Sequence, residues 1–128
     1  MHLFFHRISF LETTPENFDE FFNIHVKAPF FLSQQFASYC AVGDIINILD
    51  TKVTQNLDAF FSYVLSKKTL YEMTHMAAKA LGPEIRVNGV APGIILPSKE
   101  SSNEELKRMS EKLPLKRKGS VEDIVSAV

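Results

Sequence analysis

The sequence has few of the features that define several large classes of protein. It contains one cysteine, Cys40, so no disulfide can form within the chain, and this scarcity fits a reducing cytoplasm. Its formal net charge of -1 excludes the strongly basic surface that recruits nucleic acid or an anionic membrane. No apolar run reaches the roughly 18 residues of a membrane span. We therefore expect a cytoplasmic protein that binds neither nucleic acid nor membrane.

The sequence also lacks the pattern of a metal site or a targeting segment. The four histidines are scattered, and no histidine or cysteine spacing resembles a zinc site. Residues 1–7 are apolar, but they have no basic first region and no small-residue cleavage site, so they do not read as a signal peptide. We expect no bound metal and no cleaved leader.

The amino-acid composition is typical of a single globular domain. The 128 residues are 45% hydrophobic and 23% charged, which is ordinary for a folded protein and argues against disorder. The length suffices for one domain with a modest core and is too short for two. We treat residues 1–128 as a single domain.

A long apolar helix is predicted over residues 15–39. Thr14 is a suitable N-cap, and Pro15 suits the first turn because its missing amide hydrogen has no partner there. Pro29 lies in the middle of this helix and is expected to kink it. The elements expected after it are a strand at 45–49, a helix at about 59–81 ended by Gly82-Pro83, a strand at 85–90, a helix at about 102–112, and a helix that opens at Ser120.

The order of these elements predicts an α/β fold. The strands at 45–49 and 85–90 are almost continuously apolar, as parallel strands buried on both faces are. Alternation with helices predicts a parallel sheet covered on both faces. Two strands alone leave unpaired edges, so the pattern indicates part of a larger sheet.

Tyr63 and Lys67 are the candidate catalytic pair. Four residues apart on one helix, they share a face. A phenol has a pKa of about 10 in water, and a fixed ammonium nearby is expected to lower it toward the range that acid–base catalysis needs. The alternative is a chance pairing on a solvent-facing helix, where this spacing is common.

Four ordered motifs around this pair resemble the short-chain dehydrogenase/reductase family. Residues 63–70 (YVLSKKTL) resemble its active-site helix, and residues 85–93 (IRVNGVAPG) resemble its sixth strand and following turn. Residues 113–124 resemble the segment after its substrate loop, and residues 11–36 the helix before its fifth strand. The resemblance implies a partial Rossmann-like, doubly wound parallel sheet, truncated at both ends, that carries the catalytic half.

At two positions the sequence departs from the usual family pattern, and these departures indicate a subgroup of the family. Asp50 stands where the family usually has serine, thirteen residues before Tyr63, and His25 stands where it usually has a structural asparagine. Both features are similar to pteridine and dihydromonapterin reductases, in which the acid helps to deliver a proton to a ring nitrogen. The alternatives are that Asp50 only caps a loop and that His25 is a satisfied core residue.

The resemblance also implies a nicotinamide cofactor, with NADPH preferred. Pro92, Gly93 and Ile95 correspond to the family turn that lies against the nicotinamide, while Tyr63 and Lys67 approach the ribose. Pro97 replaces a threonine that commonly contacts phosphate. None of the five glycines forms the closely spaced motif that seats a pyrophosphate.

The resemblance implies hydride transfer to a pteridine or dihydropteridine, with Tyr63 as proton donor, Lys67 lowering its pKa, Asp50 relaying protons and His25 in support. The two long helices imply a homo-oligomer. Without the glycine-rich loop, the chain alone is expected to be inactive. The alternatives are a ketone, oxoacyl or sugar-alcohol reductase of the same family, and a non-catalytic remnant that only associates with partners.

Overall fold

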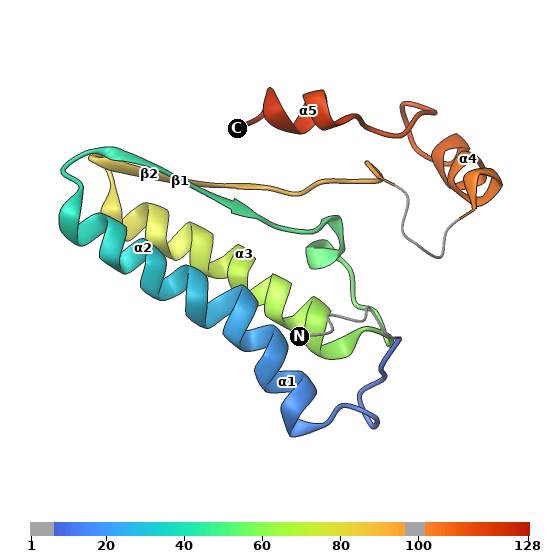
Figure 1. The fold of residues 1–128 in the computed structure, drawn as a ribbon, viewed down its shortest axis with the longest axis horizontal. Coiled ribbons are helices and arrows are strands. Elements are labelled where there is room, and N and C mark those ends of the chain that lie inside the picture. Colours follow the sequence, from blue (N-terminus) through green and yellow to red (C-terminus); the bar gives the residue numbers. More distant parts are fainter. Residues whose placement is uncertain (1–6, 97–101) are drawn as a thin grey trace.

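The computed structural model describes residues 7–96 and 102–128. Within these ranges no helix is both long and apolar enough to cross a bilayer. The elements, shown in Figure 1, are α1 (Pro15–Phe22), the π-helical turn η1 (Asn23–Lys27), α2 (Ala28–Tyr39), β1 (Gly43–Ile48), the 3-10 turn η2 (Thr51–Thr54), α3 (Phe61–Leu81), β2 (Ile85–Val90), α4 (Asn103–Glu111) and α5 (Val121–Val125).

A two-stranded parallel sheet forms the centre of the fold. β1 and β2 pair in register from Gly43 opposite Ile85 to Ile48 opposite Val90. The predicted α/β class and the parallel sheet are therefore confirmed. In Figure 1 α1, α2 and α3 all lie below the two strands, and the short α5 lies above them.

The prediction that both faces of the strands are buried is wrong for the described residues. Along β2, Ile85 and Val87 are buried, whereas Arg86 is exposed. The exposed Arg86 forms a 2.7 Å ion pair with Asp44 of β1. The physical reason is that both long helices cover the same face, so the alternate side chains of each strand point away from them.

The first helical segment runs from residue 15 to residue 39 without a break. Thr14 caps it by accepting a hydrogen bond from the Asn17 amide at 3.3 Å, as predicted. The disturbance expected at Pro29 takes the form of the π-turn η1, directly before it, where the Ala28 amide reaches back to the Asn23 carbonyl. Proline cannot donate to the preceding turn, and a widened turn accommodates that loss.

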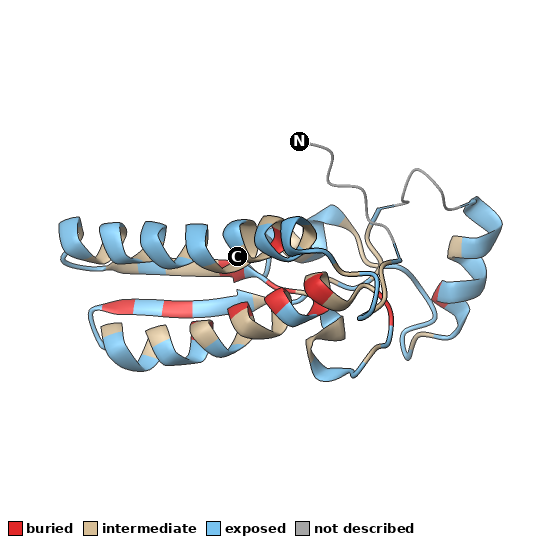
Figure 2. Cartoon of the chain, turned by 90° about the horizontal axis from the view of Figure 1, so that it is seen from below, coloured by how far each residue is buried: buried red, intermediate tan, exposed pale blue. Residues whose placement is uncertain are grey.

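The core lies between α3 and the strands, with α1 closing one end. Figure 2 shows buried positions along the side of α3 that faces the sheet and along the strands. The buried apolar residues are Phe21, Leu49, Ala59, Val64, Leu70, Ile85 and Val87. α3 begins at Phe61, after Phe60 in a left-handed conformation (φ 56°), and ends before Gly82 as predicted.

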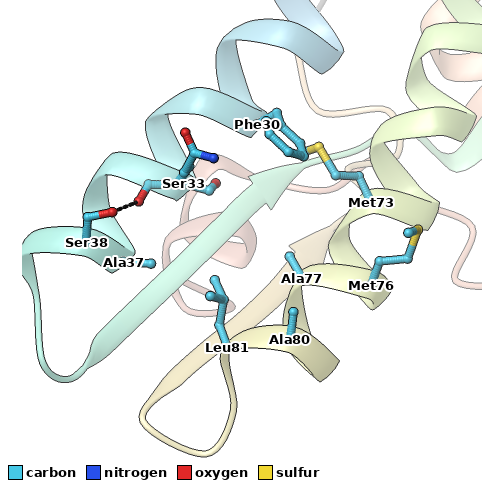
Figure 3. A pocket seen from close by; sticks show the side chains of 10 residues that line it. Phe30, Ser33, Ala37, Ser38, Met73, Met76, Ala77, Ala80 and Leu81 are labelled. Atoms are coloured by element: carbon cyan, nitrogen blue, oxygen red, sulfur yellow. Dashed lines mark hydrogen bonds between the residues drawn. The ribbon is translucent and has the colours of Figure 1, made fainter.

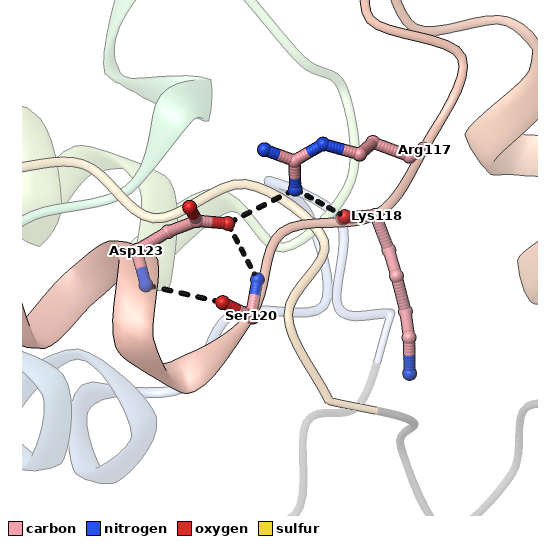
Figure 4. A network of polar contacts seen from close by, with 4 residues as sticks. All are labelled: Arg117, Lys118, Ser120 and Asp123. Atoms are coloured by element: carbon pink, nitrogen blue, oxygen red, sulfur yellow. Dashed lines mark hydrogen bonds and ion pairs between the residues drawn. The ribbon is translucent and has the colours of Figure 1, made fainter.

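The turn after β2 is tied to the start of α5. The Gly119 amide donates to the Ile94 carbonyl at 2.8 Å, and a Cβ at Gly119 would lie only 2.5 Å from Ile95 Cδ1. Ser120 and Asp123 then cap α5 reciprocally, and Arg117 pairs with Asp123 at 3.0 Å (Figure 4). A side chain at Gly119 would therefore require the Ile95 side chain to move.

A buried hydrogen bond between two side chains joins β1 to α3. Asn47 Nδ2 donates to Thr74 Oγ1 at 2.9 Å, and both side chains are buried. Thr74→Val leaves the Asn47 amide buried without its acceptor, so the free energy of unfolding should fall by roughly 1–3 kcal/mol. Urea unfolding measures this change.

Thr69→Val is the matched control for that substitution. Thr69 and Thr74 lie on the same helix, and each hydroxyl donates to the carbonyl four residues earlier. Thr69 makes that bond at an exposed position, whereas Thr74 also accepts from Asn47. An equal loss of stability in the two variants would contradict the assigned role of the Asn47 contact.

Candidate active site

The candidate catalytic residues gather at the carboxyl ends of the two strands. Asp50 lies two residues after β1 and Pro92 two residues after β2. The strands remain paired as they end, because the Leu49 amide donates to the Val90 carbonyl at 2.7 Å. Parallel α/β sheets bind their ligands beyond this edge.

Tyr63 and Asp50 are in direct contact. The Tyr63 hydroxyl donates to Asp50 Oδ2 at 2.5 Å. The other carboxylate oxygen, Oδ1, accepts the Lys52 amide at 2.8 Å and caps η2. Asp50 therefore does cap the loop, but the same two bonds fix its carboxylate against the phenol.

The expectation that Lys67 lowers the pKa of Tyr63 is wrong for this arrangement. Burial raises the pKa of Tyr63, and both the hydrogen bond to Asp50 and the charge of that carboxylate raise it further. The physical reason is that ionisation would remove the donated hydrogen and place a phenolate beside a carboxylate. Tyr63 alone is thus a weak acid at neutral pH.

Lys67 lies on the same face of α3 as Tyr63, as the spacing predicted. Its Nζ donates to the Ile48 carbonyl at the end of β1, at 2.9 Å. Burial lowers the pKa of Lys67, and the negative charge of Asp50 acts in the opposite direction. The ammonium is therefore positioned at the sheet edge by the backbone of β1.

His25 lies in the π-turn and reaches α3. Its Nδ1 is 2.9 Å from Ser66 Oγ, next to Lys67 in the sequence. The imidazole packs edge-on to the Tyr63 ring at 5.4 Å and stacks with Phe21 at 5.9 Å. Burial, and then the charge of Lys67, lower the pKa of His25 to about 4, so the ring is neutral at neutral pH.

The turn predicted to meet a nicotinamide follows β2 on the same edge. Pro92 and Ile95 are half-buried, and Gly93 is exposed. Among the described residues, apart from the two chain neighbours of Gly93, no atom lies within 4 Å of the place where its Cβ would stand, so a flat ring has room to approach this backbone. The described residues thus fit the nicotinamide end of a cofactor, while Pro97 lies outside the described residues.

Three contributors to the site were missed in the sequence. Ser66 binds His25, Phe21 contacts the rings of His25 and Tyr63, and the Ile48 carbonyl binds Lys67. Ser66 stands three residues after Tyr63, and Phe21 four residues before His25, so helical spacing was an available signal for both. A backbone carbonyl gives no signal in the sequence.

A family model and several relatives match this chain. The family model described as enoyl-(acyl carrier protein) reductase matches residues 4–128. A dihydromonapterin reductase from Enterobacter sp. (strain 638) is 37% identical over 86 residues, which are 63% of this chain and 36% of that protein. An L-xylulose reductase from Mesocricetus auratus is 34% identical over 128 residues, covering 93% of this chain and 52% of that protein.

Solved structures match the fold closely. The structure of FolM alternative dihydrofolate reductase 1 from Brucella suis, in complex with NADP, superposes with a TM-score of 0.90 at 32% identity. The match covers 99% of this chain and 53% of that one. The chain thus spans about half the length of that protein.

These matches agree with the four motifs read from the sequence. They extend over nearly the whole chain, and the solved structure reproduces the arrangement of its helices and strands. The resemblance inferred from residues 63–70 and 85–93 is therefore confirmed. The chain belongs to the short-chain dehydrogenase/reductase family.

Proposed function

We propose that this chain is the catalytic part of an NADPH-dependent reductase that acts on a pteridine or dihydropteridine. The observation that carries the proposal is the 2.5 Å contact between the Tyr63 hydroxyl and Asp50. The similarity to a dihydromonapterin reductase and to an NADP-bound alternative dihydrofolate reductase supports it. Bound NADPH would supply a hydride to the carbon of a C=N bond.

The nitrogen of that bond then needs a proton, and Tyr63 is a poor source by itself. Burial raises the pKa of Tyr63, and the Asp50 carboxylate raises it further because loss of the proton would leave a phenolate against it. A proton carried by Asp50 avoids this state, because it passes to Tyr63 as the phenol proton passes to the substrate. Asp50 is thus the proton relay and Tyr63 the final donor.

Lys67 and His25 support this pair. The Lys67 ammonium, fixed by the Ile48 carbonyl, offers further hydrogens to a ribose hydroxyl. Gly93 leaves the open space that a nicotinamide ring requires, beside Pro92 and Ile95.

We place the reaction in the cytoplasm, since the single cysteine suits a reducing compartment.

A ketone reductase is the second candidate. The L-xylulose reductase match extends over 93% of this chain, further than the 63% matched by the dihydromonapterin reductase. Reduction of a ketone needs a proton on oxygen, which Tyr63 would supply while a hydroxyl at position 50 only orients the carbonyl. Asp50 is the residue that separates the two reactions.

Residues of α2 and α3 form a groove that is suited to binding a second copy of the chain. An apolar groove of about 460 Å³ lies between these helices (Figure 3), and Phe30 and Met76 on its walls are 48% and 71% exposed. The lining residues are Phe30, Ser33, Gln34, Ala37, Ser38, Met73, Met76, Ala77, Ala80 and Leu81. We propose homo-oligomerisation through this groove, with the helices of the second copy filling it.

The substrate class is tested with a fusion. The part of the Brucella suis protein that this chain does not match is joined to residues 1–128, and NADPH oxidation is followed with a dihydropterin and with xylulose. Asp50→Ser should lower dihydropterin turnover at least about a hundredfold, because the relay is lost. The same variant should retain or gain ketone reduction.

Asp44→Ser is the control, because Asp44 is an exposed carboxylate of β1 that pairs with Arg86. It should leave both rates unchanged. Equal loss of both activities in Asp50→Ser would contradict the relay. Absence of any activity in a folded fusion, with Tyr63→Phe indistinguishable from it, would favour the non-catalytic remnant.

The 128-residue chain by itself should bind NADPH only weakly. Its five glycines are Gly43, Gly82, Gly89, Gly93 and Gly119, and none has the close spacing that seats a pyrophosphate. Calorimetric titration with NADPH should show no micromolar binding. Micromolar affinity would mean that the contacts around Lys67 and Gly93 suffice, and would overturn this expectation.

Self-association is tested with Ala80→Glu. Ala80 is exposed and lines the groove, so a carboxylate there should oppose contact with a second apolar surface without disturbing the core. Light scattering should show a lower mass for Ala80→Glu than for the unaltered chain. Ala127→Glu, an exposed site outside the groove, is the control, and a monomeric unaltered chain would refute the proposal.

A further inference from the structure

We propose that Ser66 is a positioning residue that holds His25 in the tautomer with its hydrogen on Nδ1, leaving Nε2 as a hydrogen-bond acceptor. Ser66 lies between Tyr63 and Lys67 on α3, and its hydroxyl joins the active-site helix to the π-turn 41 residues earlier. The tautomer follows from the contacts of this hydroxyl.

The Ser66 hydroxyl has a single hydrogen and two neighbours that compete for it. Its Oγ lies 2.7 Å from the Tyr63 carbonyl oxygen, which can only accept. The same Oγ lies 2.9 Å from His25 Nδ1. If Nδ1 also lacked a hydrogen, one of these two short contacts would bring lone pairs together. The arrangement is satisfied when Ser66 donates to the carbonyl and Nδ1–H donates to Ser66.

The surroundings leave Ser66 little choice of other partners. Its side chain is 0% exposed, so bulk water does not replace either contact. The imidazole of His25 is held by Phe21, which stacks on it, and by Tyr63, which meets it edge-on at 79°. These rings oppose the ring flip that would put Cδ2 in the place of Nδ1.

The charge state of His25 agrees with this assignment. Burial and the Lys67 ammonium lower the pKa of His25 to about 4, so a neutral ring with one hydrogen is the relevant species at neutral pH. In a neutral imidazole the nitrogen without the hydrogen is an acceptor. The hydrogen on Nδ1 therefore makes Nε2 the acceptor.

An acceptor at this place has a use beside Lys67. The Lys67 ammonium carries three hydrogens, one of which binds the Ile48 carbonyl. Nε2 is able to accept another, directly or through a water, and so helps to orient the ammonium toward a ribose. This use of Nε2 rests on the proposed function, whereas the tautomer does not.

The tautomer is measured by NMR on the chain labelled with ¹⁵N-histidine. A ring nitrogen that carries a hydrogen and one that lacks it differ widely in ¹⁵N shift, and His25→Asn identifies the signals of His25. The unaltered chain at neutral pH should show the hydrogen on Nδ1, with a nuclear Overhauser effect from that hydrogen to the Ser66 β protons. Ser66→Ala should shift the population toward the Nε2–H form, which water favours for histidine.

Ser62→Ala is the matched control. Ser62 is buried on the same helix, one turn earlier, and its hydroxyl contacts Thr13 rather than His25. It should leave the tautomer of His25 unchanged. A hydrogen on Nε2 in the unaltered chain, or an unchanged tautomer in folded Ser66→Ala, overturns the proposal.

If Ser66→Ala does not fold, the unaltered chain still decides the matter. The Nδ1–H signal with its contact to Ser66 supports the proposal, and an Nε2–H signal refutes it. The measurement uses neither cofactor nor substrate. Failure of the proposed reduction would therefore leave the tautomer result standing, and failure of the tautomer would leave the Tyr63–Asp50 relay standing.

Discussion

The parallel pairing of β1 and β2 sets the position of every group in the candidate site. Because Ile48 lies opposite Val90, both strands end at one edge, and the residues that follow them emerge side by side. α3 then crosses one face and brings Tyr63 to Asp50 and Lys67 to the Ile48 carbonyl. A shift of one residue in the pairing would separate the Asp50 loop from the turn at Gly93.

Two polar contacts, one buried and one half-buried, hold α3 in that position. Ser66 joins it to the π-turn through His25, and Thr74 joins it to β1 through Asn47. Apolar packing alone is non-directional and tolerates rotation of a helix about its axis. A hydrogen bond to a buried side chain does not, since rotation would leave that buried group unsatisfied. The helix that carries the phenol and the ammonium is thereby fixed from two sides.

Much of this arrangement was predictable from local patterns. Periodicity predicts the strand at 85–90 and the shared face of Tyr63 and Lys67. Capping patterns predict the helix end at Gly82 and the caps at Thr14 and Ser120. The direction of the Tyr63 pKa shift was not predictable, because it depends first on burial of the phenol in the fold and then on its contact with the Asp50 carboxylate. Helical spacing from Tyr63 placed Ser66 near the site, but its contact with His25 was not predictable because the two residues are remote in sequence.

The π-turn Asn23–Lys27 also sets the rotation of α1 about the helix axis relative to α2. Each residue of an α-helix turns the chain by about 100°, and the wide turn inserts part of an extra step between α1 and α2. Deleting one residue here would let an ordinary helix close, but all of α1 would rotate relative to α2. Phe21 would then turn away from Tyr63, and His25 from Ser66. The length of this segment is therefore constrained as tightly as the identity of any residue within it.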